Sequence, residues 1–262
     1  MTDSSHARGP MPRTVLVTGA AKRIGRVIAG RLAAEGWTVA LHYNGSAAEA
    51  EEAAAAIAAA GGRAECFRAD LGDEESTQEL MDRVTATLGP VGALVNNAST
   101  FEFDDAATAD RRRWDLHMEV NLRAPFVLTQ ALARQLPADC RGHVVNIIDQ
   151  RVLRLTPYFL TYSISKFGLW GMTQCMALAL APRIQVNAIG PGPTMQGVRQ
   201  SDEHFARQNE SMPLGHGATP DEIADTVLFL LAAPSITGTL ITVDGGQHLA
   251  WAQPGQVINP FD

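Results

Sequence analysis

The hydrophobic and polar positions of the chain follow two alternating patterns. Short apolar runs rich in β-branched residues, such as 14–18, precede longer stretches with helical spacing, such as Ile24 to Glu35. The apolar runs predict strands over 14–18, 37–43, 64–68, 93–96, 143–148, 185–189 and 240–243. The helical spacing predicts helices over 24–35, 47–60, 74–88, 110–136, 158–180 and 220–232. Such alternation requires a parallel sheet covered on both faces, so we predict an α/β fold with a doubly wound seven-stranded sheet.

The same pattern indicates one domain, over residues 13–250. No internal repeat and no linker rich in Gly, Pro or Ser divides it. Residues 1–12 have no apolar signal-peptide core and are interpreted as a disordered leader, and 251–262 as a C-terminal tail. The segment 191–217 lacks a clear strand and is long for a passive connection, so we predict a substrate lid there.

Composition narrows the classes of protein. The 262 residues include 21 Lys and Arg against 28 Asp and Glu, and a net charge of -7 disfavours a nucleic-acid partner. Three cysteines without CxxC spacing and seven histidines without HExxH spacing favour neither disulfides nor a metal site. No uncharged apolar run reaches the roughly 18 residues that span a bilayer. We therefore predict a cytoplasmic protein without membrane or metal, and we interpret its histidines as surface or packing residues.

A glycine loop, TGAAKRIG at 18–25, lies between the first predicted strand and helix. Glycines let the backbone approach a pyrophosphate, and the N–H groups of a helix N-terminus attract its negative charge. In this position the loop predicts a dinucleotide site. The alternative, a glycine turn that only reverses the chain, leaves two basic side chains without a purpose. The residues concerned are Gly19, Lys22, Arg23, Ile24 and Gly25.

The choice between NAD and NADP depends on the end of the second predicted strand, where an acidic residue would bind the adenosine 2′-hydroxyl. Here the chain reads HYNGS at 42–46, without an acid. A carboxylate would repel a 2′-phosphate, so its absence, together with Lys22, Arg23 and the Ser46 hydroxyl, favours NADP(H). Asp70 follows the third predicted strand and either accepts a hydrogen bond from adenine or forms a turn.

A tyrosine and a lysine four residues apart, Tyr162 and Lys166, share one face of the predicted helix 158–180. A free tyrosine has a pKa near 10, and a neighbouring cation is expected to lower it, so that the phenol can act as acid and base. The sequence NNAS at 96–99 and Asn121, on the predicted helix 110–136, precede this pair.

In this order of motifs the chain resembles the short-chain dehydrogenase/reductase family from residue 14 to about 249. The matching elements are TGAAKRIG, NNAS, YSISK, VDGG, Asp70, Asn121, Asn187, Pro191 and Gly192. The resemblance implies a Rossmann-type domain, a homotetramer, and catalysis by Asn121, Tyr162 and Lys166, with Lys166 also on the nicotinamide ribose. The expected cofactor contacts are Gly19, Lys22, Arg23, Ile24, Gly25, Asn44, Ser46, Asp70, Asn97, Ala98, Ser99, Tyr162, Lys166, Pro191 and Gly192.

One position departs from the family pattern. The family has a serine 13 residues before its tyrosine, where this chain has Asp149. In a closed site, desolvation would raise the pKa of this acid and keep it protonated as a donor; otherwise it is a strand-end aspartate facing solvent. A protonated acid suits reduction of a C=N bond, whose nitrogen must gain a proton.

Within the family, the chain looks most like pteridine reductases and bacterial dihydromonapterin reductases. The resemblance implies that Phe101 stacks a pterin on the nicotinamide, that Ser99 and Arg23 contact the pterin or phosphates, and that Asp149 and Tyr162 relay protons. Without this resemblance, the sequence supports equally well that Phe101 is an aromatic residue of the core or of a loop. Gly45 stands where pteridine reductases commonly have arginine, which weakens the 2′-phosphate contact. The alternatives are a general carbonyl reductase of the 3-oxoacyl or sugar-alcohol type and a non-catalytic NADP sensor.

Overall fold

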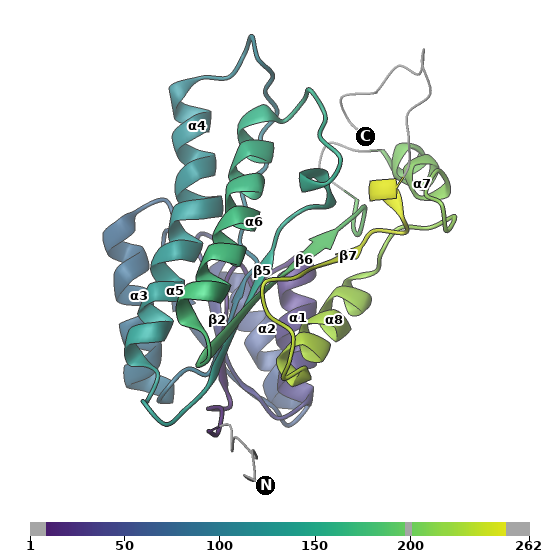
Figure 1. The fold of residues 1–262 in the computed structure, drawn as a ribbon. Helices are drawn as coiled ribbons and strands as arrows, with labels where there is room; N and C mark the ends of the chain where they lie inside the picture. The colour runs from purple at the N-terminus through teal and green to yellow at the C-terminus, as the bar shows by residue number, and fades with distance from the viewer. Residues whose placement is uncertain (1–8, 197–200, 250–262) are drawn as a thin grey trace, which may run out of the picture.

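The computed structural model describes residues 9–196 and 201–249 and confirms the predicted fold class. Seven parallel strands form one sheet in the order β3-β2-β1-β4-β5-β6-β7 (Figure 1). The order reverses beside β1, so the loops after β1 and β4 lie next to each other at the carboxyl edge, where ligands bind in open α/β sheets. The strands are β1 Thr14–Val17, β2 Thr38–Tyr43, β3 Arg63–Arg68, β4 Ala93–Asn96, β5 Gly142–Ile147, β6 Ile184–Pro191 and β7 Leu240–Val243.

Helices cover both faces of the sheet (Figure 1), and an apolar core lies between the sheet and the helices on each face. On one face pack α1 Arg23–Ala34, α2 Ala47–Ala59 and α8 Pro220–Ala232. On the other face pack α3 Glu74–Leu88, α5 Ala124–Gln135 and α6 Leu160–Leu180. The central strands β1 and β4 are buried at every position, which explains their continuous apolar sequence. Within the described ranges, no helix is both long enough and apolar enough to traverse a membrane.

The helix predicted over 110–136 is interrupted. Helix α4 covers Arg111–Met118, a π-helical turn follows at Glu119–Arg123, and α5 then begins at Ala124. A π-turn inserts one residue into a helix and is frequent at functional sites. Here it contains the buried Asn121, whose amide bonds the loop after β4. The periodicity of the sequence does not reveal this turn, because the turn is stabilised by contacts with a distant loop.

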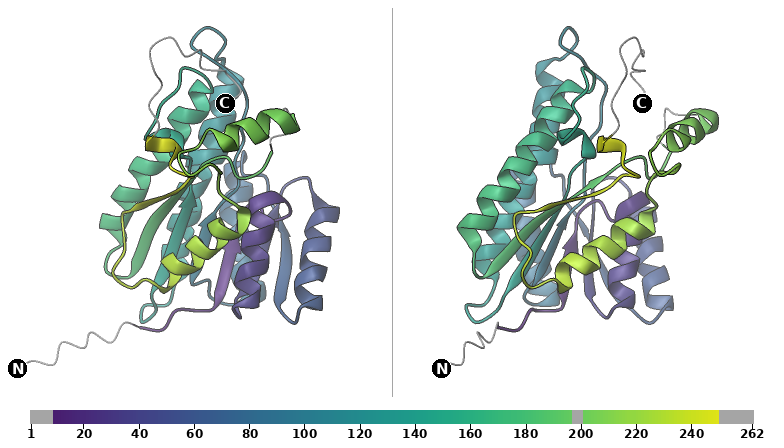
Figure 2. Two further views of the ribbon diagram at one scale, coloured as in Figure 1. Left: turned by 90° about the vertical axis from the view of Figure 1, so that its right-hand side faces the viewer. Right: turned by 45° about the vertical axis from the view of Figure 1, so that its right-hand side comes forward.

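Two further segments differ from the sequence expectations. Residues 9–12 of the predicted disordered leader pack against the domain, where the Pro10 carbonyl accepts a hydrogen bond from the Arg141 N–H at 3.0 Å. Residues 1–8 and the predicted tail 251–262 lie outside the described residues. The predicted lid begins while β6 still continues to Pro191, and it contains the helix α7 Asp202–Glu210. Both views of Figure 2 place α7 beyond the carboxyl edge of the sheet.

The N-terminus of α6 is capped from a distant loop. Phe159, which precedes the helix, has a left-handed backbone with φ 54° and makes no side-chain cap. Asp104 takes over this function: its carbonyl accepts from the Phe159 N–H at 2.8 Å, and its carboxylate accepts from the main chain (3.2 Å) and the hydroxyl of Thr161. His117 completes the network, with Nδ1 2.7 Å from the Thr161 hydroxyl. All three side chains are buried.

Because Asp104 satisfies buried donors, Asp104→Ala is expected to lower the free energy of unfolding by about 2–3 kcal/mol. Asp115→Ala removes an exposed ion pair with Arg111 and is the control, with an expected loss below about 1 kcal/mol. Urea denaturation of both variants measures the difference. Equal losses in the two variants would show that Asp104 does not cap α6.

Candidate active site

The glycine loop after β1 is fastened to the loop after β4. The Thr18 hydroxyl accepts hydrogen bonds from the N–H groups of Asn97 at 2.9 Å and Ala98 at 3.0 Å, and the Asn97 amide donates to the Thr18 carbonyl at 2.8 Å. A Cβ on Gly25 would lie 2.3 Å from the Gly19 carbonyl and 2.5 Å from the Asn97 amide, so only glycine fits. Gly19 has φ 64°, which glycine adopts without strain. This cradle fits the close approach of a dinucleotide phosphate backbone.

His42 is a site residue that sequence reasoning missed. It is 2% exposed on β2, its Nδ1 accepts from the Gly19 N–H at 3.0 Å, and its Nε2 lies 3.2 Å from the Ala69 carbonyl. These partners require a neutral ring with the proton on Nε2. Burial lowers the pKa of His42 to about 4. The only sequence signal was a histidine inside an apolar strand, which is common in cores.

Three of the predicted nucleotide-binding residues, Lys22, Asn44 and Ser46, lie near the start of α2 or contact Asp70. Lys22 extends to α2, where its Nζ lies 2.6 Å from the Glu49 carboxylate. Ser46 precedes α2 without capping it by its side chain, and the Asn44 amide donates to Asp70 at 3.3 Å. Sequence reasoning found no acid at the end of β2, but the fold brings the Glu49 carboxylate to Lys22.

Arg23 lies apart from this group. Its guanidinium donates to the carbonyls of Met195 at 3.1 Å and Gln196 at 2.9 Å, in the segment after β6. It therefore links the glycine loop to the predicted lid. Gly192 lies against β7, since its N–H donates to the Val243 carbonyl at 3.0 Å and a Cβ would lie 2.7 Å from the Asp244 side chain.

Asn121 organises the loop after β4. Its Oδ1 accepts from the Thr100 N–H at 2.8 Å and the Ser99 hydroxyl at 3.2 Å. Its amide donates to the Thr100 carbonyl and to the Ser165 hydroxyl, both at 3.1 Å. Asn121 therefore joins this loop to α6, the helix that bears the predicted catalytic tyrosine.

Asp149 and Tyr162 meet directly, with the tyrosine hydroxyl donating to Asp149 Oδ2 at 2.8 Å. The other oxygen, Oδ1, accepts from the Arg151 N–H at 2.8 Å. Asp149 thus faces the phenol, and its alternative interpretation as a solvent-facing aspartate is wrong. Both carboxylate oxygens accept hydrogen bonds, and the protonated form expected from the sequence stays a prediction.

The expected effect of Lys166 on Tyr162 is not found in the structure. Burial, and then the negative charge and hydrogen bond of Asp149, raise the pKa of Tyr162 well above its usual value. The Lys166 ammonium donates to the Ile147 carbonyl at 2.9 Å and lies 5.8 Å from the centroid of the Tyr162 ring. Burial lowers the pKa of Lys166 to about 8. Helical spacing placed both residues on one face, but it could not show where the ammonium points.

Phe101 adjoins the Asp149–Tyr162 pair. Its ring centroid is 4.6 Å from that of Tyr162, edge to face, and 4.2 Å from that of Phe159, stacked. The Phe101 side chain remains 48% exposed, so one side is open to a ligand. Asp149, Tyr162 and Phe101 form one surface with acidic, phenolic and aromatic groups.

The fold and this site together define a dinucleotide-dependent oxidoreductase, because the glycine cradle lies at the carboxyl edge of the sheet and α6 brings Tyr162 and Lys166 to the end of β5 at the same edge. A family model described as enoyl-(acyl carrier protein) reductase matches residues 19–248. The chain belongs to the short-chain dehydrogenase/reductase family.

Several relatives and solved structures are similar to this chain. The 3-oxoacyl-[acyl-carrier-protein] reductase FabG of Staphylococcus epidermidis is 32% identical over 91% of this chain and 100% of its own length. The crystal structure of FolM alternative dihydrofolate reductase 1 from Brucella canis, complexed with NADP, is 45% identical with TM-score 0.90, and the match covers 93% of this chain and 97% of that one. A short-chain dehydrogenase from Burkholderia cenocepacia, also with NADP, is 35% identical with TM-score 0.84, covering 93% and 99%.

Proposed function

We propose that this protein is an NADPH-dependent reductase of a dihydropteridine of the dihydrobiopterin or dihydromonapterin type. The proposal rests on the contact between the Tyr162 hydroxyl and the Asp149 carboxylate beside the open ring of Phe101. A carboxyl group at the position where a serine is expected suits a C=N bond, whose nitrogen must take up a proton. The similarity to a structure described as an alternative dihydrofolate reductase supports this substrate class.

The residues of the glycine cradle fit NADP(H), which supplies the hydride when bound. Gly19, Gly25 and the N-terminus of α1 would hold the pyrophosphate, and Lys22 would hold the 2′-phosphate. Lys22 would then exchange its exposed contact with Glu49 for the phosphate. NADP in the solved structures of similar proteins supports this choice of cofactor. Lys166 would hold the nicotinamide ribose, and Ser99 and Arg23 would contact the substrate or the phosphates.

The proton is the part of the reaction that this chain's own residues supply. Tyr162 and Asp149 share one hydrogen bond and together hold the proton that the ring nitrogen gains as the neighbouring carbon is reduced. Phe101 would orient the flat ring beside them. Tyr162 is buried and the Asp149 side chain is 18% exposed, which limits the competition of water for the proton.

Asp149→Ser tests this assignment. With dihydrobiopterin or dihydromonapterin and NADPH, we expect kcat/KM to fall about 10²-fold, because the acid beside the ring nitrogen is lost. With acetoacetyl or sugar ketones, a loss of less than about tenfold is expected, since serine can serve a carbonyl oxygen. Initial rates of NADPH oxidation measure both, with NADH assays in parallel. Equal losses would contradict a role of Asp149 in proton supply.

The second candidate is a general carbonyl reductase of the 3-oxoacyl or sugar-alcohol type. The similarity to 3-oxoacyl-[acyl-carrier-protein] reductases along most of the chain favours it. The same substrate panel distinguishes the two, because turnover of ketones alone would contradict the dihydropteridine proposal. A non-catalytic NADP sensor is disfavoured by the joint presence of Asn121, Tyr162 and Lys166.

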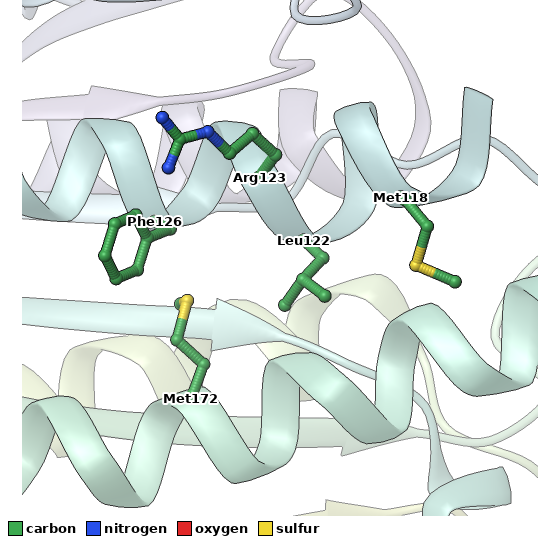
Figure 3. Close-up of a pocket in the computed structure, with 5 residues that line it drawn as sticks. All are labelled: Met118, Leu122, Arg123, Phe126 and Met172. Carbon is green, nitrogen blue, oxygen red and sulfur yellow. The ribbon is translucent and has the colours of Figure 1, made fainter. Parts of the chain in front are cut away.

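We further propose a homotetramer, which the family resemblance implies, located in the cytoplasm, which the composition of the chain favours. Helices α4, α5 and α6 present an apolar surface that includes an open hollow of about 310 Å³ (Figure 3). The hollow is lined by Met118, Leu122, Arg123, Phe126 and Met172. Nearby on α6, Ile164, Phe167 and Leu178 are exposed. A surface of this kind fits a second copy of the chain.

Phe167→Glu is therefore expected to dissociate the assembly, because it places a charge in an apolar interface. Light scattering coupled to size-exclusion chromatography measures the mass. Ala55→Glu, an exposed position on α2, is the control and should leave the mass unchanged. A Phe167→Glu protein with unchanged mass would place the interface elsewhere.

A further inference from the structure

Arg151 lies next to the Asp149–Tyr162 pair without belonging to any motif found in the sequence. Its Nε is 3.9 Å from Asp149 Oδ2, the same oxygen that accepts from the Tyr162 hydroxyl at 2.8 Å. Its main-chain N–H donates to the other oxygen, Oδ1, at 2.8 Å. The side chains of Arg151 and Asp149 are only 13% and 18% exposed. One carboxylate oxygen therefore faces a phenol and a guanidinium in a largely buried environment.

Aromatic rings hold this guanidinium in place. Arg151 Cζ lies 5.1 Å from the ring centroid of Phe159 and 5.7 Å from that of Phe101. The two rings stack on each other, and Phe101 also touches the ring of Tyr162. Cation–π contacts strengthen when water is excluded, and charges act over a longer range there than in solvent. Arg151 is thus fixed relative to the pair.

The other charged and titratable groups around the pair act differently. The Lys166 ammonium is directed to the Ile147 carbonyl. Burial lowers the pKa of His117, whose ring centroid is 6.0 Å from that of Tyr162, and its Nε2 accepts the Glu102 N–H, so it is neutral. The carboxylate of Asp104 is bound by the N-terminus of α6. Lys166 also senses the negative charge of Asp149, which raises the pKa of Lys166 in opposition to burial. Among the described residues, Arg151 is the cation that forms an ion pair with Asp149.

The position of Arg151 offsets an unfavourable effect of the Asp149 carboxylate on the acidity of Tyr162. The negative charge and hydrogen bond of Asp149, 2.8 Å away, add to the effect of burial and raise the pKa of Tyr162, so the phenol holds its proton more tightly. A nearby cation favours the ionised phenol and so makes the Tyr162 hydroxyl a better proton donor. In the structure, the charge of Arg151 lowers the pKa of Tyr162, in opposition to the effects of burial and Asp149.

We propose that Arg151 is the positioning residue that balances the charge of Asp149, so that the Asp149–Tyr162 pair can release its proton to the substrate. This inference rests on the proposed role of that pair as the proton source. It assigns to Arg151 a function in the reaction that depends on the acid at position 149.

The first test is the pH profile of kcat/KM, measured with whichever pteridine or ketone the wild type reduces fastest. Arg151→Met removes a positive charge, so the pair becomes a weaker acid. We expect the alkaline limb to move up by about one pH unit and the plateau to fall about tenfold. Arg151→Lys keeps the charge and should restore the limb to within about 0.3 unit. If Arg151→Met does not fold, Arg151→Gln is the second neutral variant.

The second test requires no substrate. Melting temperatures are compared for Arg151→Met, Asp149→Asn and the double variant. Arg151→Met should lower the melting temperature by about 3 °C more when Asp149 is present than when it is combined with Asp149→Asn. Additive melting temperatures, or an alkaline limb that does not move, would overturn the proposal. Absence of dihydropteridine turnover by the wild type would reject the proposed function, while both tests of Arg151 would still give a result.

Discussion

Tyr162→Phe is expected to abolish most of the NADPH-dependent reductase activity while cofactor binding persists. The substitution removes one hydroxyl, the donor to Asp149, and keeps the ring that contacts Phe101. Loss of a positioned general acid lowers kcat by about 10²–10⁴-fold. The dissociation constant of NADPH, measured by fluorescence titration, should change less than about threefold, because the variant loses at most one neutral hydrogen bond to the cofactor.

Tyr158→Phe is the matched control, since it removes a hydroxyl four residues earlier, beside Phe103 and outside the pair. Its kcat should stay within about threefold of the wild type, because its hydroxyl is not expected to enter the proton transfer. Similar losses in both variants would contradict the assignment of Tyr162. A large loss of NADPH affinity in Tyr162→Phe would instead indicate that this hydroxyl acts mainly in cofactor binding and not in proton transfer.

Acid is expected to destabilise the protein through His42. Its pKa is about 4 in the folded state and about 6.5 when unfolded, so the unfolded chain binds the proton more strongly. The stability that depends on neutral His42 is complete above pH 6.5 and is lost as the pH falls towards 4. Between pH 7 and pH 5 the expected loss is about 2 kcal/mol. Urea denaturation at both pH values measures it.

His42→Gln is the variant for comparison, because an amide can accept from Gly19 and donate to Ala69 without titrating. Its loss of stability between pH 7 and pH 5 should be about 2 kcal/mol smaller than that of the wild type. His117, whose pKa burial also lowers, contributes equally to both proteins and cancels in the difference. The same pH dependence in wild type and variant would contradict the assigned role of His42.

The cofactor side of the site was largely predictable because it is local. Gly19, Gly25 and the start of α1 are contiguous in the sequence, and their backbone requirements are visible in the residue types. The direction in which the Lys22 and Arg23 side chains point could not be predicted from the sequence. Lys22 contacts Glu49 and Arg23 contacts Met195 and Gln196, partners that only the folded chain places within reach.

The catalytic side depended more on the fold. The spacing of Tyr162 and Lys166 predicted a shared helix face, and the structure places Asp149 at the phenol. The predicted lowering of the pKa of Tyr162 was wrong, since the structure raises it. Lys166 donates to the Ile147 carbonyl, while Asp149 accepts from the phenol. Side-chain direction depends on the acceptors that surround it, and β5 supplies the acceptor for Lys166.

Periodicity and glycine positions by themselves determined the parallel α/β sheet and the candidate phosphate loop, and helical spacing paired Tyr162 with Lys166. These features follow from interactions between near neighbours along the chain. Asp149 and Phe101 became candidates through the family resemblance. Tertiary structure alone decided the π-turn at Asn121, the bond from His42 to the glycine loop, and the placement of Arg151 beside Asp149. Each of these features is a contact between groups that only folding brings together. The order of residues does not show which groups will meet.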